Sequence, residues 1–309
     1  MKHPVAIGLL IVAIAVLGAL PLIAPPYYVR VGQIFLLSSV LALAWQILGG
    51  FAGYWSFGHT AFVGLGAFAA GLLHVHFKLP PMLGFVSGIL LGGLVSAGFA
   101  ALVAYPVLRL RGIYFAIALL GMSQVLGELA QNVDAFKGSL GLTLPDIVPG
   151  TLRPEDFFYY CFLALAVGSF ALAAWIRASK FGYGLSAIRE DEDTARMLGV
   201  PTERYKIIAF VVSAGLAGLA GAVYAYALGY FTAGSVFRID FSLNMILHCM
   251  LGGIGTLTGP VIGAALLVFI TNVLLGRLLD LHLLVTGALV VGLVLLAPGG
   301  LLGLARRRR

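Results

Sequence analysis

The stretch KIIAFVVSAGLAGLAGAVYAYAL, residues 206–228, decides the fold class of this chain, because its 23 residues carry a single charge, at Lys206. The hydrocarbon core of a bilayer is about 30 Å thick, and a helix needs about 20 apolar residues to cross it. Residues 206–228 therefore predict a membrane-spanning helix.

Comparable apolar stretches recur along the chain, and together with residues 206–228 they make about ten candidate spans. Those that begin at residues 60, 241 and 282 are short or rich in glycine, and one of them can enter and leave the membrane on the same side. We therefore predict an all-α, polytopic transmembrane helical bundle of about 8–10 spans. The other candidates are residues 5–24, 31–48, 60–77, 82–104, 112–130, 157–176, 241–256, 259–279 and 282–297.

The composition favours one membrane domain over residues 1–309. Hydrophobic residues make up 61% of the chain and charged residues only 10%, whereas soluble domains carry about 25% charged residues. No stretch is left over for a soluble domain of useful size. The first span follows residues 1–3 and ends in residues 21–26, PLIAPP, a pattern similar to a signal peptide. The length of the apolar run and the spans that follow favour a retained helix over cleavage.

The net charge of +7 is explained better by the positive-inside rule, which places Lys and Arg on the cytoplasmic side, than by nucleic-acid binding. With both termini in the cytoplasm, 13 basic residues lie inside and six outside, and this ratio favours that orientation. The arginines at the end of the chain then face anionic lipid head groups. The inner residues are Lys2, Arg109, Arg111, Arg177, Lys180, Arg189, Arg196, Arg204, Lys206, Arg306, Arg307, Arg308 and Arg309, and the outer ones are Arg30, Lys78, Lys137, Arg153, Arg238 and Arg277.

Two long loops are expected, an external one at residues 131–156 and a cytoplasmic one at residues 177–205. The cytoplasmic loop contains helix-forming residues at 185–198, and Gly199 followed by Pro201 ends that helix. Its apolar residues lie on one arc, which acidic residues interrupt. Because a helix this short is marginal alone in water, we expect it to dock into a groove on another protein; a solvated connector is the alternative.

Residues 49–62, GGFAGYWSFGHTAF, interrupt the apolar pattern with four glycines. Non-helical backbone is tolerated at membrane depth only where protein or a wet cavity covers it. We therefore predict that this segment lines a path through the membrane. A lone histidine near a membrane boundary is more often structural than a proton relay, and we expect His59 to bond a freed backbone group. The residues assigned to this break are Ser56, Phe57, Gly58, His59 and Phe62.

Residues 251–264, LGGIGTLTGPVIGA, form a second glycine-rich interruption, and its proline cannot donate to the helix ladder. Paired breaks in the two halves of a chain indicate inverted repeats with a path at their interface. Close packing of helices through small residues is the alternative. The residues assigned to this break are Gly252, Gly253, Gly255, Gly259 and Pro260.

The sequence offers little that could catalyse a reaction. It contains no G-x-x-x-x-G-K-[ST] phosphate loop, so ATP hydrolysis is not expected of this chain. The histidines are scattered without metal-ligand spacing, and Cys161 and Cys249 indicate neither a disulfide nor a zinc site. The spans hold almost none of the ionisable groups that ion-coupled transporters and channels use, and Glu128 is expected at the membrane interface.

Taken together, these motifs resemble the LivM/LivH-type permeases of branched-chain amino-acid ABC transporters, LivM more than LivH. The resemblance runs from about residue 36 to residue 300, with S-x-G-H-x-x-F at residues 56–62 and G-G-x-G-x-x-x-G-P at residues 252–260. In such importers a cytoplasmic loop with a glutamate, a small residue and a glycine at fixed spacing contacts the ATPase. This implies ATPase coupling through Ile188, Arg189, Glu190, Asp191, Glu192, Ala195 and Gly199.

The resemblance further implies an importer permease without an ATPase site of its own. It would form half of the path for branched-chain or related amino acids, in a bacterial-type inner membrane. Its partners would be a second, related permease in a heterodimer, two ABC ATPase subunits and a solute-binding protein. The chain itself would bind no cofactor, and ATP would be used by the partners. A permease of the same family for urea or short amides is an alternative, and an ion-coupled secondary transporter or channel is a more distant one.

Overall fold

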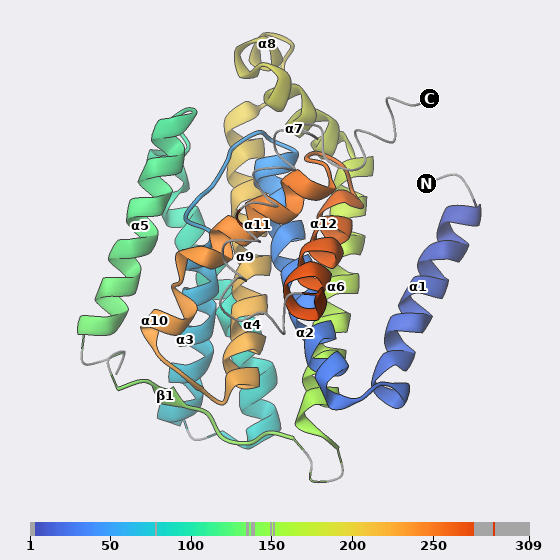
Figure 1. Ribbon diagram of the computed structural model, residues 1–309. Helices are drawn as coiled ribbons and strands as arrows, with labels where there is room; N and C mark the ends of the chain where they lie inside the picture. Colours follow the sequence, from blue (N-terminus) through green and yellow to red (C-terminus); the bar gives the residue numbers. More distant parts are fainter. Residues whose placement is uncertain are drawn as a thin grey trace.

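The computed structural model (Figure 1) describes residues 4–274, apart from 78, 134, 135, 137–139, 149 and 151, and also residue 287. In this part of the chain six helices are long and apolar enough to cross a membrane. They confirm an all-α polytopic bundle. They are α2 Pro26–Trp45 with its π-helical extension η1 Gln46–Gly50, α3 Thr60–Phe77, α4 Pro81–Val107, α5 Ile113–Asn132, α6 Pro154–Ala178 and α9 Thr202–Leu228.

Prolines mark the start of several of these helices. Pro26, Pro81 and Pro154 are the first residues of α2, α4 and α6. A proline is tolerated in the first turn because the N–H that it lacks has no partner there, and its fixed φ suits the helix. The first helix, α1 Pro4–Ile23, also begins at a proline. Over this half of the chain, the ends of the predicted spans lie within about five residues of the ends of the observed helices.

Helix α9, which contains the stretch quoted first, packs most extensively against α3 and α4 and also contacts α2. Small residues make this possible: a Cβ added to Gly66 of α3 would overlap the backbone of Gly218 on α9, and one added to Gly218 would overlap Ser96 of α4. The Ser96 hydroxyl donates a hydrogen bond to the carbonyl oxygen of Phe62 at 2.9 Å. Close approach through small residues is the usual way in which membrane helices pack.

The last described helices are shorter than predicted. The candidate span at residues 241–256 is α11 Ile239–Gly252, which has 14 residues and is therefore about 21 Å long. Since that is less than the hydrocarbon core, α11 is not a full span. It packs against α12 Gly259–Val268, which continues as the π-helix η3 Phe269–Leu274. The candidate span at residues 282–297, apart from residue 287, and the end of the one at 259–279 lie outside the described residues.

The two ends of the bundle differ in structure (Figure 1). One end carries the short helices α7 Lys180–Glu190 and α8 Glu192–Met197, together with the α2–α3 and α4–α5 connections; we call it the α8 end. At the opposite end, β1 Leu142–Thr143 pairs antiparallel with β2 Tyr230–Phe231, and the short helix α10 Ala233–Val236 follows β2. The predicted inner basic residues of the helix connections lie at the α8 end. That this end faces the cytoplasm stays a prediction.

Candidate functional site

The segment predicted as one helix over residues 185–198 is two helices. Helix α7 ends at Glu190, and Asp191 takes an extended conformation with φ −160° and ψ 116° before α8 begins. The Asp191 carboxylate accepts a hydrogen bond from the backbone N–H of Thr194 at 2.6 Å, which is an N-cap interaction. The prediction of a single helix was wrong because this carboxylate satisfies an unpaired N–H of a second helix.

Gly199 ends α8, as the sequence predicted. Its φ of +85° lies in the left-handed region, which favours glycine. The N–H of Gly199 donates to the carbonyl oxygen of Arg196, and the N–H of Val200 donates to that of Ala195, both at 3.0 Å. These two bonds form a Schellman motif, which satisfies carbonyl groups that the helix end would leave unpaired.

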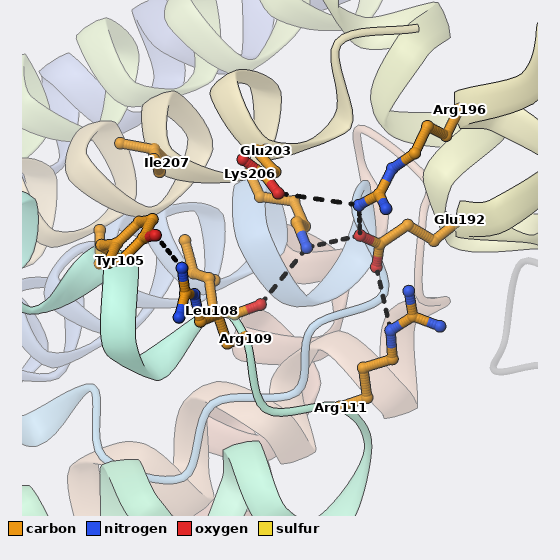
Figure 2. Close-up of a pocket in the computed structure, with 10 residues that line it drawn as sticks. Tyr105, Leu108, Arg109, Arg111, Glu192, Arg196, Glu203, Lys206 and Ile207 are labelled. Carbon is orange, nitrogen blue, oxygen red and sulfur yellow. Dashed lines mark hydrogen bonds and ion pairs between the residues drawn. The ribbon is translucent and has the colours of Figure 1, made fainter.

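A buried ion pair fixes α8 to the bundle (Figure 2). The Glu192 carboxylate lies 2.6 Å from Lys206 Nζ, and their side chains are 9% and 5% exposed. Lys206 also donates to the Leu108 carbonyl oxygen at 3.3 Å and to the Tyr54 hydroxyl at 3.0 Å. The Tyr54 hydroxyl in turn donates to Glu192. The Glu192–Lys206 pair and its hydrogen bonds therefore join four parts of the protein: α8, the start of α9, the end of α4 and the α2–α3 connection.

Arginines surround this pair and extend it toward the surface. Arg196 lies 3.6 Å from Glu192, and Arg111 lies 3.9 Å from it. Arg111 also donates two hydrogen bonds of 2.9 Å to the Asp193 carboxylate. Figure 2 shows Arg111 and Arg196 on either side of Glu192, beside a cavity of about 150 Å³.

The charges of this network lower the pKa values of its carboxyl groups. Burial opposes ionisation of Glu192, but the hydrogen bonds from Lys206 and Tyr54 and the charges of Lys206 and Arg111 outweigh it, so the pKa of Glu192 falls below its ordinary value of 4.5. The hydrogen bonds and charge of Arg111 lower the pKa of Asp193 in the same way. Both carboxylates are therefore ionised at neutral pH.

The sequence did not identify this network. From the sequence, Lys206 is only one of the basic residues expected on the inner side, and Tyr54 has no expected role. A lysine within the first turns of an apolar helix must be paired or must reach the interface, and this rule is the signal that could have found it. The sequence cannot show its partner, because Tyr54 lies 152 residues away along the chain.

The other predicted coupling residues divide into a buried set and an exposed set. Ile188 and Ala195 are 4% and 2% exposed, so they seat α7 and α8 on the bundle. Glu190 and Asp191 are exposed, and both line a groove of about 620 Å³ between residues 52–57, the start of α5 and the α7–α8 junction. Leu198, predicted on the same arc as Ile188, is instead 79% exposed, because the break at Asp191 turns α8 away from the line of α7.

Apolar side chains are exposed around α8. Met197 is 87% exposed, Leu198 79% and Tyr183 of α7 71%. In Figure 1, α8 is the element that projects farthest beyond this end of the bundle. Large apolar side chains that protrude at the tip of a helix pair indicate a contact with another protein.

His59 holds the α2–α3 connection by bonds to hydroxyl groups. Its Nδ1 lies 2.7 Å from Ser56 Oγ, and its Nε2 lies 2.6 Å from Ser213 Oγ on α9. Since the Ser213 hydroxyl donates to the Ala44 carbonyl oxygen at 2.6 Å, it must accept from His59, which places the proton on Nε2. The prediction that His59 bonds a freed backbone group was wrong. Trp45 takes that role, donating from Nε1 to the Ser56 carbonyl oxygen at 2.8 Å.

The residues assigned to the first break mostly lie inside the protein. Ser56, Gly58, His59 and Phe62 are buried, so protein covers this part of the segment, whereas residues 52–55 border the groove. Phe57 is half-buried and lines the groove that also contains Glu190. That these residues line a translocation path stays a prediction.

The second break is a tight turn between α11 and α12. Gly252 and Gly259 approach so closely that a Cβ on Gly252 would overlap the Gly259 backbone. The Thr256 hydroxyl donates to the Gly253 carbonyl oxygen at 2.7 Å and accepts from the Gly259 N–H at 3.1 Å. Pro260 stands in the first turn of α12, where its missing N–H costs nothing. The break therefore connects two short helices.

The described residues hold no group of three or more His, Cys, Asp or Glu side chains that could bind a metal ion. Cys249 is buried, with its thiol 3.2 Å from the Ala42 carbonyl oxygen, and Cys161 is half-buried. Glu128 is exposed near the end of α5, and its carboxylate lies 3.2 Å from the Asn132 amide. Among the described residues, the network at the α8 end contains most of the ion pairs, and the Arg238–Asp240 pair stands apart from it.

The sequence was also compared with known protein families, and one family matches. The family described as "Branched-chain amino acid transport system / permease component" matches residues 27–294. The chain belongs to this permease family. It is accordingly a multi-pass membrane protein and a permease component of a transport system.

Individual permeases of the family are similar over most of their length. The high-affinity branched-chain amino acid transport system permease protein LivM of Salmonella typhimurium is 30% identical over 294 residues, which cover 86% of this chain and 68% of that protein. LivM of Escherichia coli is 28% identical, covering 96% and 75%. LivH of Escherichia coli is 28% identical, covering 86% and 91%. No solved structure gave a significant match.

Proposed function

We propose that this permease is the membrane-spanning subunit of an ABC importer and that separate ATPase subunits dock on α7 and α8. The observation that carries this proposal is the combination of an exposed apolar end of α8, formed by Met197 and Leu198, with the buried ion pair of Glu192 at the start of the same helix. A partner that binds this end can exert force on the bundle, because the Glu192–Lys206 pair fixes α8 to α9.

A solvated connector would not need this construction. A flexible linker has few buried contacts, whereas Ile188 and Ala195 are buried and Glu192 is anchored by a lysine and two arginines. Met197 and Leu198 are exposed to water, and burying each of these side chains would contribute about 1.5–3 kcal/mol of favourable free energy. Docking of a partner would recover that free energy.

The relatives support the permease partner that we propose. Both LivM and LivH are named as permease proteins of the high-affinity branched-chain amino acid transport system, and both are similar to this chain. A second, related permease as the heterodimer partner fits this pairing. A solute-binding protein on the outer face and two ATPases on the inner face complete the assembly that we propose. The α8 end then faces the cytoplasm, and both termini are cytoplasmic.

The proposed solute is a branched-chain or related amino acid, because the LivM and LivH permeases that are similar to this chain are named for branched-chain amino acids. Urea or a short amide is the alternative within the family. We assign ATP hydrolysis to the partner subunits, since this chain has no phosphate loop, and we assign no cofactor to the chain itself.

Co-purification tests the docking proposal. The permease is coexpressed with its ATPase, and the amount of ATPase retained per permease is measured for the wild type and for the Leu198→Glu variant. We expect a large loss of ATPase, because a carboxylate at this site cannot be buried in an apolar groove without cost. Leu140→Glu is the matched control, since Leu140 is equally exposed at 79% but lies two residues before β1, at the opposite end of the bundle.

Two results would refute the proposal. One is equal ATPase retention by the Leu198→Glu variant and the wild type. The other is solute accumulation by the purified chain alone, driven by an ion gradient and without nucleotide. Comparing the uptake of leucine, isoleucine, valine and urea, each in competition with the others, then identifies the solute.

A further inference from the structure

Arg189 of α7 reaches both glycine-rich breaks at the α8 end. Its Nη1 donates a hydrogen bond to the carbonyl oxygen of Gly50 at 2.8 Å, where the π-helical extension of α2 ends. A Cβ added to Gly53 would lie 3.2 Å from Arg189 Cγ, and one added to Gly255 would overlap Arg189 Nη1. One side chain therefore contacts the α2–α3 connection and the α11–α12 turn, which lie about 200 residues apart in sequence.

Both glycines next to Arg189 have positive φ angles, +78° at Gly53 and +78° at Gly255. Their missing side chains leave the space that the arginine occupies. A larger residue at either position would be strained by its backbone and would also displace the side chain of Arg189. Glycine at these positions thus serves the fit of one arginine as well as the turn.

The two breaks also contact each other directly beside Arg189. Gln46 of η1 donates from Nε2 to the Thr256 carbonyl oxygen at 2.7 Å. The end of α2, the α11–α12 turn and α7 therefore form one continuous set of contacts. A displacement of α7 acts on both breaks together through this set.

The local sequence makes this geometry unexpected for an arginine. Four acidic residues follow it directly, at residues 190–193, and their carboxylates would be its nearest partners along the chain. In the structure the nearby arginines that pair with those carboxylates are Arg111 and Arg196. Arg189 turns to the backbone instead, where its fixed planar fork holds a carbonyl oxygen at a defined distance.

We infer that Arg189 is the positioning residue through which movement of the ATPase-docked helices α7 and α8 reaches the two breaks. This inference rests on the proposed function, because it needs an ATPase to move α7. This role differs from that of Met197 and Leu198, which form the docking surface. Arg189 contacts the bundle and not the ATPase. Coupling of this kind requires packed groups that can change arrangement, and the glycines at positions 50, 53 and 255 leave the backbone next to Arg189 free to do so.

The decisive measurement is the number of solute molecules imported per ATP hydrolysed. The complete complex, with its ATPases, second permease and binding protein, is reconstituted in liposomes. Four quantities are recorded: ATPase retained, hydrolysis rate, uptake rate and the elution profile of the complex. The Arg189→Ala variant should keep assembly and hydrolysis within about twofold of the wild type and lose about tenfold in solute imported per ATP.

Conservative and matched variants separate positioning from general damage. Arg189→Lys keeps a donor on a long side chain and should restore part of the lost coupling ratio. Arg204→Ala removes another exposed arginine from this end of the bundle and should leave the ratio unchanged; among the described residues, Arg204 makes no hydrogen bond or ion pair through its side chain. Gly255→Ala should lower the ratio as Arg189→Ala does, because its methyl group takes the place of Nη1.

A double variant tests whether the two changes act through the same contact. If they do, Arg189→Ala with Gly255→Ala should lose little more than Arg189→Ala alone. The inference is overturned if Arg189→Ala imports as much solute per ATP as the wild type. It is also overturned if Arg189→Ala loses its ATPase, which would make Arg189 a docking residue. A wild-type complex without ATP-dependent uptake would refute the proposed function, and this inference with it.

Discussion

Glu192→Gln should destabilise the protein more than Lys206→Met, although the two side chains form one ion pair. Removing one partner of a buried pair costs about 3–5 kcal/mol, because the other charge stays buried without compensation. After Glu192→Gln, Lys206, whose side chain is 5% exposed in the wild type, keeps only neutral oxygen acceptors, those of Tyr54, Leu108 and the new amide at position 192. The full cost of about 3 kcal/mol or more therefore applies.

Lys206→Met leaves a better-compensated charge. Glu192 then still has Arg196 at 3.6 Å and Arg111 at 3.9 Å, and it keeps the hydrogen bond from the Tyr54 hydroxyl. We expect a cost of about 1–2 kcal/mol, close to that of losing one charge-assisted hydrogen bond. The double variant should cost less than the sum of the two, since it leaves no unpaired charge at the centre of the network.

Equilibrium unfolding in detergent micelles, followed by tryptophan fluorescence, measures these differences in the free energy of unfolding. Arg238→Gln is the control, because Arg238 forms an ion pair of 2.6 Å with Asp240 in which both side chains are more than half exposed. Such pairs contribute about 0–1 kcal/mol. Additive single-variant costs, or a larger cost for Lys206→Met than for Glu192→Gln, would refute the reasoning.

Three further outcomes are expected. Glu190→Arg should abolish uptake while leaving membrane insertion intact, because Glu190 is exposed beside the groove at the α7–α8 junction; uptake at the wild-type rate would contradict its coupling role. The pKa of Glu192 is lowered in the folded protein, so its stabilising contribution is complete above its ordinary value of 4.5 and is lost as the pH falls through the lowered value; the protection factors for hydrogen exchange at residues 192–197 should fall in that acidic range and stay constant from pH 6 to 8. Gly199→Val should destabilise the end of α8 by about 1–3 kcal/mol, because a β-branched residue is strained at φ +85°, and faster exchange at the Val200 N–H would report it, whereas unchanged exchange would argue against the Schellman motif.

The apolar spans were predictable because hydrophobicity and length alone specify a membrane helix. The candidate at residues 60–77 coincides with α3, and the one at residues 206–228 differs from α9 only at its start. The short helix α11 was harder to predict, because the apolar run continues past Gly252 while the backbone turns at Gly253, where φ is +126°. Composition cannot distinguish a glycine inside a helix from one that ends it.

The contacts of the candidate site were not predictable, because they join residues far apart in sequence. His59 pairs with Ser213, 154 residues away, and Arg189 with Gly50, 139 residues away. The local break at Asp191 was visible only as an interruption of the apolar arc. Whether an aspartate interrupts a helix or caps the next one depends on where the chain goes after it, and here the Glu192–Lys206 pair sets that direction.

The two anchors of the α2–α3 connection explain why a small movement of α7 would have a directed effect. At its far end the connection is held inside the bundle by His59 to Ser213 and by Trp45 to the Ser56 carbonyl oxygen. At its near end, Arg189 holds Gly50. If Gly50 is displaced while the far end stays fixed, backbone angles between the two anchors must change. That interval contains Gly53, which adopts a positive φ of +78°. As a glycine it has the least restricted backbone of any residue. Helices cannot absorb such a movement without breaking hydrogen bonds, so the displacement concentrates in the connection and in the groove that it lines.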